Sequence, residues 1–299
     1  MENLAMNWCK RLNAVIRFNE PLSKHTTLRV GPIARIWIEP HTLGALKSII
    51  KKAKAEKEDY LVIGAGSKLL ITKKEIPLAI HLGRGVFTDC RSDDNNLIAG
   101  AGAPLAKVIR VAYENSLGGL EFLSGIPATV GGALALNAGV GWPERIEMGS
   151  FVDRLEVIDA NGELKILRKK DLKFGYRFSN LRNYIIVKAR FTLFKKRKKN
   201  IKKRIAQFLE YRKKTQSIGS FSAGCVFKNV AGHSSGKLID VCGLKGAHRG
   251  DAVISSVHAN FIINQGQATA KDILALMSLM KKEVKKKFKL DLEPEIEIV

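Results

Sequence analysis

Residues 118–139 read GGLEFLSGIPATVGGALALNAG and form the most distinctive stretch of the chain. Glycine and small aliphatic side chains dominate this stretch, and Glu121 is its only charged residue. Glycine lets the backbone approach a ligand closely and adopts positive φ at little cost. Successive free backbone N–H groups in such a loop can bind an anion without any lysine. The composition therefore predicts either a phosphate-binding loop or a glycine-rich turn inside a core, and it leaves both open.

Length and composition point to a folded protein of two or three domains. The chain has 299 residues, 45% of them hydrophobic, which is enough for separate cores and too much for global disorder. No run reaches the roughly 18 apolar residues that a bilayer-spanning helix needs. The opening sequence MENLAMNWCKRLNAVIRF lacks the apolar stretch and small-residue cleavage site of a secretory signal. We therefore expect a cytoplasmic protein with no membrane partner.

The cysteines do not suggest a metal centre or a disulfide framework. Cys9, Cys90, Cys225 and Cys242 lie far apart, with no Cys-x-x-Cys pair and no Cys/His cluster at metal-ligand spacing. We expect reduced thiols and no bound metal.

The net charge of +23 raises the possibility of a polyanionic partner such as nucleic acid. Much of the excess lies in two runs, KKRKKNIKKR at 195–204 and KKEVKKKFK at 281–289. Neither run is interleaved with the aromatic side chains on which single-strand binders stack bases. Solvated helix faces or a basic linker explain both runs, so no specific nucleic-acid partner is expected, although a basic nucleic-acid-binding protein stays an alternative.

Periodicity in the first half predicts helices alternating with strands. We expect a helical segment over residues 1–20 and a helix over 43–58 with lysines on its outer face. YLVIGAG at 60–66 is typical of a buried strand that runs into a glycine turn. Residues 105–116 predict another helix.

The second half predicts a hairpin, a domain boundary and a mixed carboxyl-terminal region. Residues 151–172 read as two strands joined at Asn161-Gly162, a favoured hairpin turn. The lysine run at 195–204 is the expected boundary between domains. Beyond it we expect helices over 236–242 and 270–288 between short strands. The whole pattern indicates an α+β chain with mixed sheets.

GIPATVGGA at 125–133, followed by LNAG at 136–139, resembles the flavin-binding signature of the UDP-N-acetylenolpyruvoylglucosamine reductase family. The family usually has GIPGTVGGA and MNAG, so Ala128 and Leu136 are departures. The resemblance extends from about residue 22 to the carboxyl terminus and implies FAD as cofactor. It assigns flavin contacts to Gly125, Ile126, Pro127, Thr129, Gly131, Gly132, Asn137 and Gly139.

VIGAGSKLL at 62–70 matches neither of the common phosphate-binding fingerprints. Leu69 stands where a Gly-x-Gly-x-x-Gly motif needs its last glycine, and no Gly-Lys-Ser/Thr closes a P-loop. In the family a GGGSN-like turn at this point wraps the flavin diphosphate. The resemblance therefore adds Gly64, Ala65, Gly66 and Ser67 to the flavin contacts, with Lys68 in place of the usual asparagine.

Three further motifs resemble the catalytic motifs of the family. FGYRFS at 174–179 supplies Arg177, which would face the substrate carboxylate as a bidentate guanidinium. SAGCVFKN at 222–229 places Cys225 where the family has a proton-donating serine, and a thiol is the stronger acid. LEPEIEIV at 292–299 supplies Glu295, with Glu297 as the fallback. The resemblance implies that Glu295, together with Arg177, stabilises the enolate formed in the reaction, as a neutral acid or through a water. Alternation places Glu293, Glu295 and Glu297 on one strand face.

Substrate contacts follow from the same resemblance. Tyr176, Lys228 and Asn229 are expected to hold the substrate, and His258 of HANFIIN has a supporting role. The short segment after Arg177 resembles the compact subtype, which lacks a substrate-covering insertion with an extra tyrosine.

The resemblance implies a PCMH-type FAD-binding fold over residues 21–195, in two subdomains at about 21–90 and 91–195. A carboxyl-terminal α/β domain over 200–299 would bind the substrate. The implied activity is NADPH-dependent reduction of UDP-N-acetylglucosamine enolpyruvate to UDP-N-acetylmuramate, a peptidoglycan precursor, by a monomer. Another PCMH-type flavin oxidoreductase is the second alternative.

Overall fold

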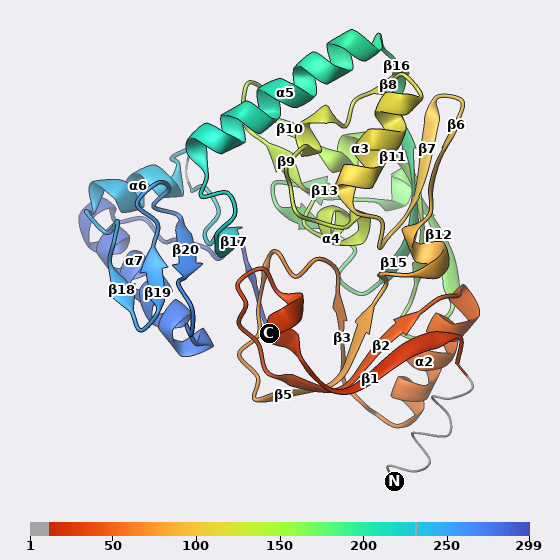
Figure 1. Ribbon diagram of the computed structural model, residues 1–299, viewed down its shortest axis with the longest axis horizontal. Coiled ribbons are helices and arrows are strands. Elements are labelled where there is room, and N and C mark those ends of the chain that lie inside the picture. Colours follow the sequence, from red (N-terminus) through yellow and green to blue (C-terminus); the bar gives the residue numbers. More distant parts are fainter. Residues whose placement is uncertain (1–11, 231) are drawn as a thin grey trace. The chain divides into compact units, whose positions relative to one another are not determined.

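The structure is a computed structural model, and it describes residues 12–230 and 232–299. The chain divides into two compact units (Figure 1). The first contains residues 1–20, 34–65 and 76–209, and the second contains residues 21–33, 66–75 and 210–299. Segments 21–33 and 66–75, which the sequence places in a flavin domain over 21–195, thus group with the carboxyl-terminal residues. The chain alternates between the two units before it enters the carboxyl-terminal region.

The first unit begins with a four-stranded sheet. Its strand order is β1 (Ala14–Pro21), β2 (Ile33–Pro40), β5 (Glu75–His81) and β3 (Tyr60–Ile63). Strands β3 and β5 pair in parallel, with Tyr60 opposite Leu78. The helix expected over 43–58 is α2 (Leu43–Ala55), and the Thr42 side chain caps its amino terminus.

The helix expected over residues 1–20 is not formed in the part of that segment which the structure describes. Residues 14–21 form strand β1 instead, and residues 1–11 lie outside the described residues. The β-branched and aromatic side chains of AVIRFNEP, above all Val15, Ile16 and Phe18, suit a pleated strand. Pairing with β2 decides between helix and strand in so short a segment.

A five-stranded antiparallel sheet forms the centre of the first unit. Its order is β12 (Leu164–Arg168), β11 (Val152–Ile158), β15 (Ile185–Thr192), β7 (Asn96–Gly100) and β6 (Cys90–Asp93). The hairpin expected over 151–172 is confirmed as β11 and β12. Its turn contains Gly162 with φ +79°, a conformation that favours glycine.

One face of this sheet packs against helices. Leu97, Leu155 and Ala189 are buried in one hydrophobic cluster with residues of α3 (Leu105–Glu114) and α4 (Val130–Ala135) (Figure 1). The short elements of the unit are η2 (Gly85–Thr88), β8 (Leu117–Gly118), η3 (Glu121–Leu123), β9 (Gly139–Val140), β10 (Ile146–Glu147), η4 (Met148–Phe151), η5 (Lys169–Asp171), β13 (Phe174–Gly175), β14 (Phe178–Ser179) and β16 (Phe194–Lys195).

The lysine run at 195–204 is mostly helical. Helix α5 (Lys198–Thr215) begins inside the run and continues past it, so that residues up to 209 group with the first unit and the rest with the second. Its lysines alternate with buried Ile201 and Phe208, and the basic residues therefore cover the solvated side of a helix.

The second unit is a four-stranded sheet with helices. The strand order is β17 (Phe221–Cys225), β20 (Phe261–Asn264), β19 (Ala252–Ile254) and β18 (His248–Arg249). Helix α7 (Ala270–Phe288) confirms the expected helix over 270–288. The other elements of the unit are η1 (Leu22–His25), β4 (Leu69–Leu70), α6 (Ser235–Val241) and β21 (Glu297–Ile298).

The expected strand over residues 292–299 is shorter, and its acidic side chains do not share a face. Only Glu297 and Ile298 are a strand, which pairs in parallel with β4. The Glu295 residue is 7% exposed, whereas Glu293 and Glu297 are exposed. Pro294 precedes Glu295 and interrupts the extended run, because proline provides no N–H for a ladder.

Candidate active site

The glycine-rich stretch forms a tightly packed turn and helix in the first unit. The N–H groups of Val130 and Gly131 donate to the carbonyls of Ala103 and Ala101, at 3.0 and 2.7 Å. Thr129 caps helix α4 by accepting from Gly132 N at 3.4 Å. These N–H groups are therefore used within the chain, and the glycines matter here for close approach of the backbone rather than as free donors.

The turn after β3 lies against the same cap. A Cβ atom at Gly64 would stand 2.6 Å from Thr129 Oγ1, so only glycine fits there without a shift. Gly64 and Ala65 thus lie beside the glycine-rich stretch, as expected for two parts of one cofactor site. Gly66 and Ser67 follow in the chain but group with the second unit. There Gly66 has φ +61°, and a Cβ would stand 2.0 Å from the carbonyl oxygen of His25.

Asn137 has a structural role in the first unit. Its side chain is 1% exposed and donates to Glu147 Oε2 at 3.0 Å and to the carbonyl of Gly175 at 2.8 Å. Its Oδ1 accepts from Gly149 N at 2.8 Å. Both ends of the amide are therefore bonded to the chain, and one of them fixes the residue just before Tyr176.

Arg177 is held next to the end of the glycine-rich stretch. Its Nη1 donates to the carbonyl of Gly139 at 3.3 Å, and its guanidinium carbon lies 5.4 Å from the centre of the Tyr176 ring. The guanidinium carbon of Arg145 lies 5.1 Å from the centre of the same ring. Arg177 itself has φ +52°, a conformation that bulky residues rarely adopt. The observed strain is typical of residues whose placement serves function.

Cys225 ends the edge strand β17 at an irregularity of the second unit. The pairing of β17 with β20 shifts register between Ser222 and Cys225, and Gly224 adopts φ +69°. Such a bulge inserts a residue and re-aims the side chain that follows it. The Cys225 residue is half-buried and forms no disulfide among the described residues.

Lys68 joins Cys225 to Glu295. Its ammonium donates to the carbonyl oxygen of Cys225 and pairs with Glu295 Oε1, both at 2.7 Å. The Glu295 side chain is 5% exposed, and that of Lys68 is 27% exposed. Glu295 is further fixed by its N–H, which donates to the carbonyl of Val226 at 2.8 Å. An ion pair uses the carboxylate form of Glu295, whereas the sequence suggested a neutral acid or a water-mediated role.

The remaining candidates lie around this cluster. Lys228 Nζ pairs with Glu293 Oε2 at 3.2 Å, and Asn229 Oδ1 accepts from Ser235 N at 3.1 Å. Burial lowers the pKa of His258, and its Nδ1 accepts from the N–H of Asn260 at 3.2 Å. A neutral ring that accepts from the backbone fits the supporting role expected for His258.

Two residues contribute to this cluster that the sequence did not single out for it. Asn260 binds both backbone groups of Phe227, with its Oδ1 accepting at 3.0 Å and its Nδ2 donating at 2.8 Å. This clamp fixes the strand end that carries Cys225. Lys68 was noticed only as a departure from asparagine in the glycine turn. The HANF motif contains Asn260, but nothing in its pattern reveals a partner 33 positions away.

The other described cysteines have different environments. Burial raises the pKa of the Cys90 thiol to about 11, and it also raises the pKa of Cys242. Both thiols are therefore held protonated, and Cys9 lies outside the described residues. Within residues 12–230 and 232–299, no three side chains are grouped as a metal site would require. No helix in that part of the chain has the length and apolar character of a membrane span.

Comparison with known proteins places both units in one family. The model described as the UDP-N-acetylenolpyruvoylglucosamine reductase carboxyl-terminal domain matches residues 216–299, and an FAD binding domain model matches residues 34–168. The UDP-N-acetylenolpyruvoylglucosamine reductase of Syntrophobacter fumaroxidans is 38% identical over 100% of this chain and 92% of its own length. The chain belongs to the UDP-N-acetylenolpyruvoylglucosamine reductase family.

Other members of the reductase family agree with this assignment. The reductase of Caldanaerobacter subterraneus is 37% identical over 94% of this chain and 92% of its own length. The crystal structure of the reductase from Thermus caldophilus matches 95% of this chain and 98% of its own, with a TM-score of 0.80 and 36% identity. These matches favour the reductase family over the two alternatives that the sequence left open.

The residues of the first unit fit an FAD molecule. Gly64 packs against Thr129 and Gly131 packs against Ala101, so the two glycine segments expected to contact the cofactor lie together. The hydroxyl of Ser124, within the glycine-rich stretch, is buried and has no hydrogen-bond partner among the described residues. Glu121, the one charged residue of the stretch, is paired with Lys196 at 2.9 Å. Its negative charge is therefore balanced and would not repel an anionic diphosphate as a free carboxylate would.

Proposed function

We propose that this chain catalyses the NADPH-dependent reduction of UDP-N-acetylglucosamine enolpyruvate to UDP-N-acetylmuramate. The observation that carries the proposal is the cluster in the second unit, where one ammonium, that of Lys68, contacts both the Cys225 backbone and Glu295. In a chain related over its whole length to these reductases, that cluster contains Cys225, the expected proton donor, and Glu295, which is expected to stabilise the enolate.

FAD would supply the hydride carrier between NADPH and the vinyl carbon of the substrate. The chain would hold it through the turn at Gly64 and Ala65 with Gly66 and Ser67, and through the glycine-rich stretch. The glycine-rich stretch would contribute Gly125, Ile126, Pro127, Thr129, Gly131, Gly132 and Gly139. Asn137 would act by fixing that stretch, since both ends of its amide are already bonded.

Arg177 would bind the substrate carboxylate. Its guanidinium is permanently charged and offers two parallel N–H donors, which match a carboxylate in geometry. The bond to the Gly139 carbonyl and the adjacent Tyr176 ring limit its rotamers before substrate arrives. This preorganisation reduces the entropy that binding would otherwise cost.

Cys225 would deliver the proton. Reduction of the vinyl group leaves negative charge at the carbon next to the carboxylate, and the thiol would transfer its proton to that carbon. The thiolate that remains would regain a proton from water. Lys68 supports this role, because its bond to the Cys225 carbonyl holds the backbone that carries the thiol. Glu295 would balance the Lys68 charge and hold the ammonium in place.

Substrate binding would involve Tyr176 in the first unit and Lys228, Asn229 and His258 in the second. Lys228 and Asn229 already have partners in Glu293 and Ser235, so substrate would exchange these contacts or use the remaining donors. For His258, the proposed contribution is to keep Asn260 and hence the Cys225 strand in place.

The proposal is tested by spectroscopy of the purified protein without oxygen. The flavin absorbance should bleach on adding NADPH, and it should return only on adding the enolpyruvyl UDP-sugar. A protein that neither contains nor takes up FAD would contradict the proposal. Reduced flavin that reacts quickly with oxygen and ignores the UDP-sugar would assign a different oxidoreductase activity.

We also propose that the protein acts as a monomer in the cytoplasm, as its relatives' role in precursor synthesis suggests. Sedimentation equilibrium would report a mass near 33.0 kDa for a monomer. A mass twice as large, stable on dilution, would contradict this part of the proposal.

A further inference from the structure

Four arginines form a single row across the outer face of the five-stranded sheet. Arg154 of β11 lies opposite Arg168 of β12 on one side and opposite Arg190 of β15 on the other. Arg190 lies opposite Ile98 of β7, which lies opposite Arg91 of β6. Neighbouring strands lie about 4.8 Å apart, so this arginine row crosses about 19 Å of sheet.

The arginine row lies on the face of the sheet that the helices do not cover. The residues that alternate with it along the strands, such as Leu155 and Ala189, are buried in the core. Arg91, Arg154 and Arg168 are exposed, and Arg190 is half-buried. Successive side chains of a strand point to opposite faces, so the arginines point away from the core.

The charges of the row are only partly balanced by the protein. Arg190 lies 3.6 Å from carboxylate oxygens of both Asp93 and Asp153. In the part of the chain that the structure describes, no carboxylate lies within ion-pair distance of Arg91, Arg154 or Arg168. Like charges directly opposite one another destabilise a sheet. Arginines face one another on three adjacent strands, so a bound anion would reduce the repulsion between them.

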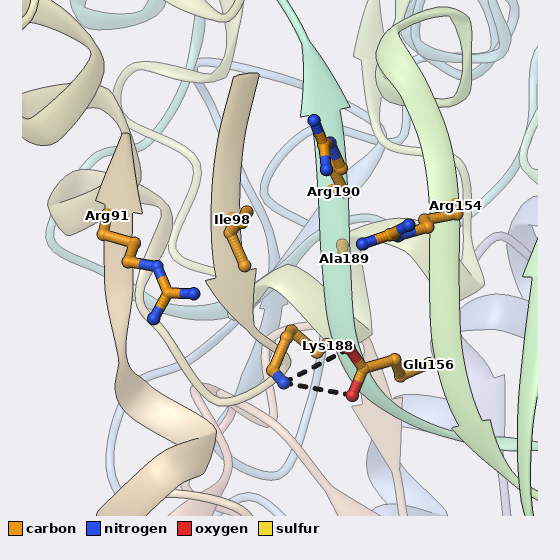
Figure 2. A pocket seen from close by; sticks show the side chains of 7 residues that line it. All are labelled: Arg91, Ile98, Arg154, Glu156, Lys188, Ala189 and Arg190. Atoms are coloured by element: carbon orange, nitrogen blue, oxygen red, sulfur yellow. Dashed lines mark hydrogen bonds and ion pairs between the residues drawn. The ribbon is translucent and has the colours of Figure 1, made fainter. Parts of the chain in front are cut away.

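A hollow on this face lies between the arginines (Figure 2). Its volume is about 90 Å³. The residues that line it are Arg91, Arg154, Arg190, Lys188, Glu156, Ile98 and Ala189. Lys188 is neutralised by Glu156, which accepts two hydrogen bonds at 3.0 and 3.2 Å. The volume corresponds to about three water molecules, which is the size range of one phosphate group.

The Nε atom of Arg190 is buried and makes no hydrogen bond within the described residues. Its ion-pair contact with Asp153 Oδ2, at 3.6 Å, is longer than a hydrogen bond. None of the residues that line the hollow is aromatic. Proteins that bind single-stranded nucleic acid stack bases on aromatic rings, and this surface provides none. Charge complementarity here therefore favours a chain of phosphates without bases.

We propose that the arginine row binds a linear oligophosphate, with one phosphate group in the hollow and its neighbours along the row. Guanidinium groups bind phosphate oxygens bidentately, and a row of them matches an anion whose charges repeat along a line. The site lies on the first unit alone and is independent of the proposed reductase activity.

The test is calorimetric titration of the FAD-bound protein with inorganic tripolyphosphate at about 0.15 M salt, where distant surface charges are screened. Arg91→Gln and Arg154→Gln should each weaken binding about tenfold, because each removes a charged donor. Arg35→Gln, at a 52% exposed arginine side chain of the other sheet, is the matched control and should leave the affinity unchanged. The rate of flavin reduction by NADPH should be the same in all four proteins.

Three results would overturn the proposal. Absence of binding at this salt concentration is the first. Equal affinity of wild type and both row variants would place the oligophosphate elsewhere, for example in the substrate site. Binding of a single-stranded oligonucleotide, lost in the row variants, without binding of tripolyphosphate would assign the surface to nucleic acid instead.

Discussion

The glycine-rich stretch of the first unit and the Lys68 cluster of the second unit differ in how they use their residues. Around the stretch, the absence of side chains is what matters: a Cβ at Gly64, in the turn packed against it, would stand 2.6 Å from Thr129 Oγ1. In the cluster, charged and reactive side chains matter, and Lys68 contacts both Cys225 and Glu295 at 2.7 Å. The first arrangement lets two backbone segments pack closely, and the second places an ion pair beside the backbone that carries a thiol. Mutations in the two regions should therefore change different properties: cofactor binding in the first, and turnover and stability in the second.

Removing the Cys225 thiol should have the largest effect. Cys225→Ala should lower turnover by about 10²–10⁴-fold, the usual contribution of a positioned acid. Bleaching of the flavin by NADPH should be unchanged, because that half-reaction does not use the thiol. Stopped-flow absorbance measures the two halves separately.

Cys225→Ser is the matched control, since a hydroxyl can also donate a proton and serine is usual in the family. It should retain turnover well above that of the alanine variant. Normal turnover by Cys225→Ala would remove Cys225 from the mechanism.

Breaking the ion pair between Lys68 and Glu295 should have the second-largest effect. Lys68→Met leaves Glu295, whose side chain is 5% exposed, without its partner charge. We expect the free energy of unfolding to fall by about 3 kcal/mol, the lower end of the range for buried pairs, because Lys68 is partly exposed. Urea denaturation measures the loss.

Two further variants sharpen the result for Lys68. Adding Glu295→Gln should recover part of the stability, because the carboxylate that lost its partner is then absent. Lys285→Met breaks an exposed pair with Asp291 in the same unit and should cost far less. Equal losses of unfolding free energy for Lys68→Met and Lys285→Met would show that the buried pair contributes no more to stability than the exposed pair.

Adding a side chain at Gly64 should have a smaller effect, and it should act on cofactor binding rather than on turnover. Gly64→Ala forces a methyl group against the Thr129 cap, and overpacking of this kind costs about 1–3 kcal/mol. We expect this cost to appear as FAD affinity lowered by about tenfold or more. Flavin absorbance per polypeptide after dialysis measures it.

Gly141→Ala is the control, because no atom lies within 4 Å of the added Cβ. It should retain wild-type flavin content. Full flavin content in Gly64→Ala would mean that the close approach at this turn does not matter for the cofactor.

The smallest expected effect concerns acid sensitivity in the second unit. Burial lowers the pKa of His258 below its ordinary value of 6.5, so the unfolded chain binds a proton at a higher pH than the folded chain does. The neutral ring therefore contributes stability above about pH 6.5, and that contribution is lost as the pH falls through the folded pKa. Urea midpoints should decrease between about pH 7.5 and pH 5.5.

His258→Asn should make this decrease shallower, and the same change at His248, which is exposed, should not. An identical pH dependence in His258→Asn and wild type would show that the buried ring does not contribute.

Local signals were enough for much of the fold. The Asn161-Gly162 turn predicts its hairpin because its backbone conformation admits few other residues. Helix α7 was predictable because Thr269 and Asp272 form a capping box and the apolar side chains repeat at helical spacing. Strand β1 was not predictable, since pairing with β2 overrides the weak local preference of so short a segment.

The amino-acid sequence alone predicts which residue types matter: the glycines at 64 and 131, the arginine at 177, and a thiol where the family has a hydroxyl. Those choices are local, because each depends on one backbone conformation or one functional group. Only the tertiary structure decided that Lys68 turns toward Cys225 and Glu295, 157 and 227 positions away in the chain. It also decided that arginines from β6, β11, β12 and β15 form one row. Both arrangements depend on strand pairing and burial. These bring together residues that lie far apart in the sequence, so no local pattern predicts the contact.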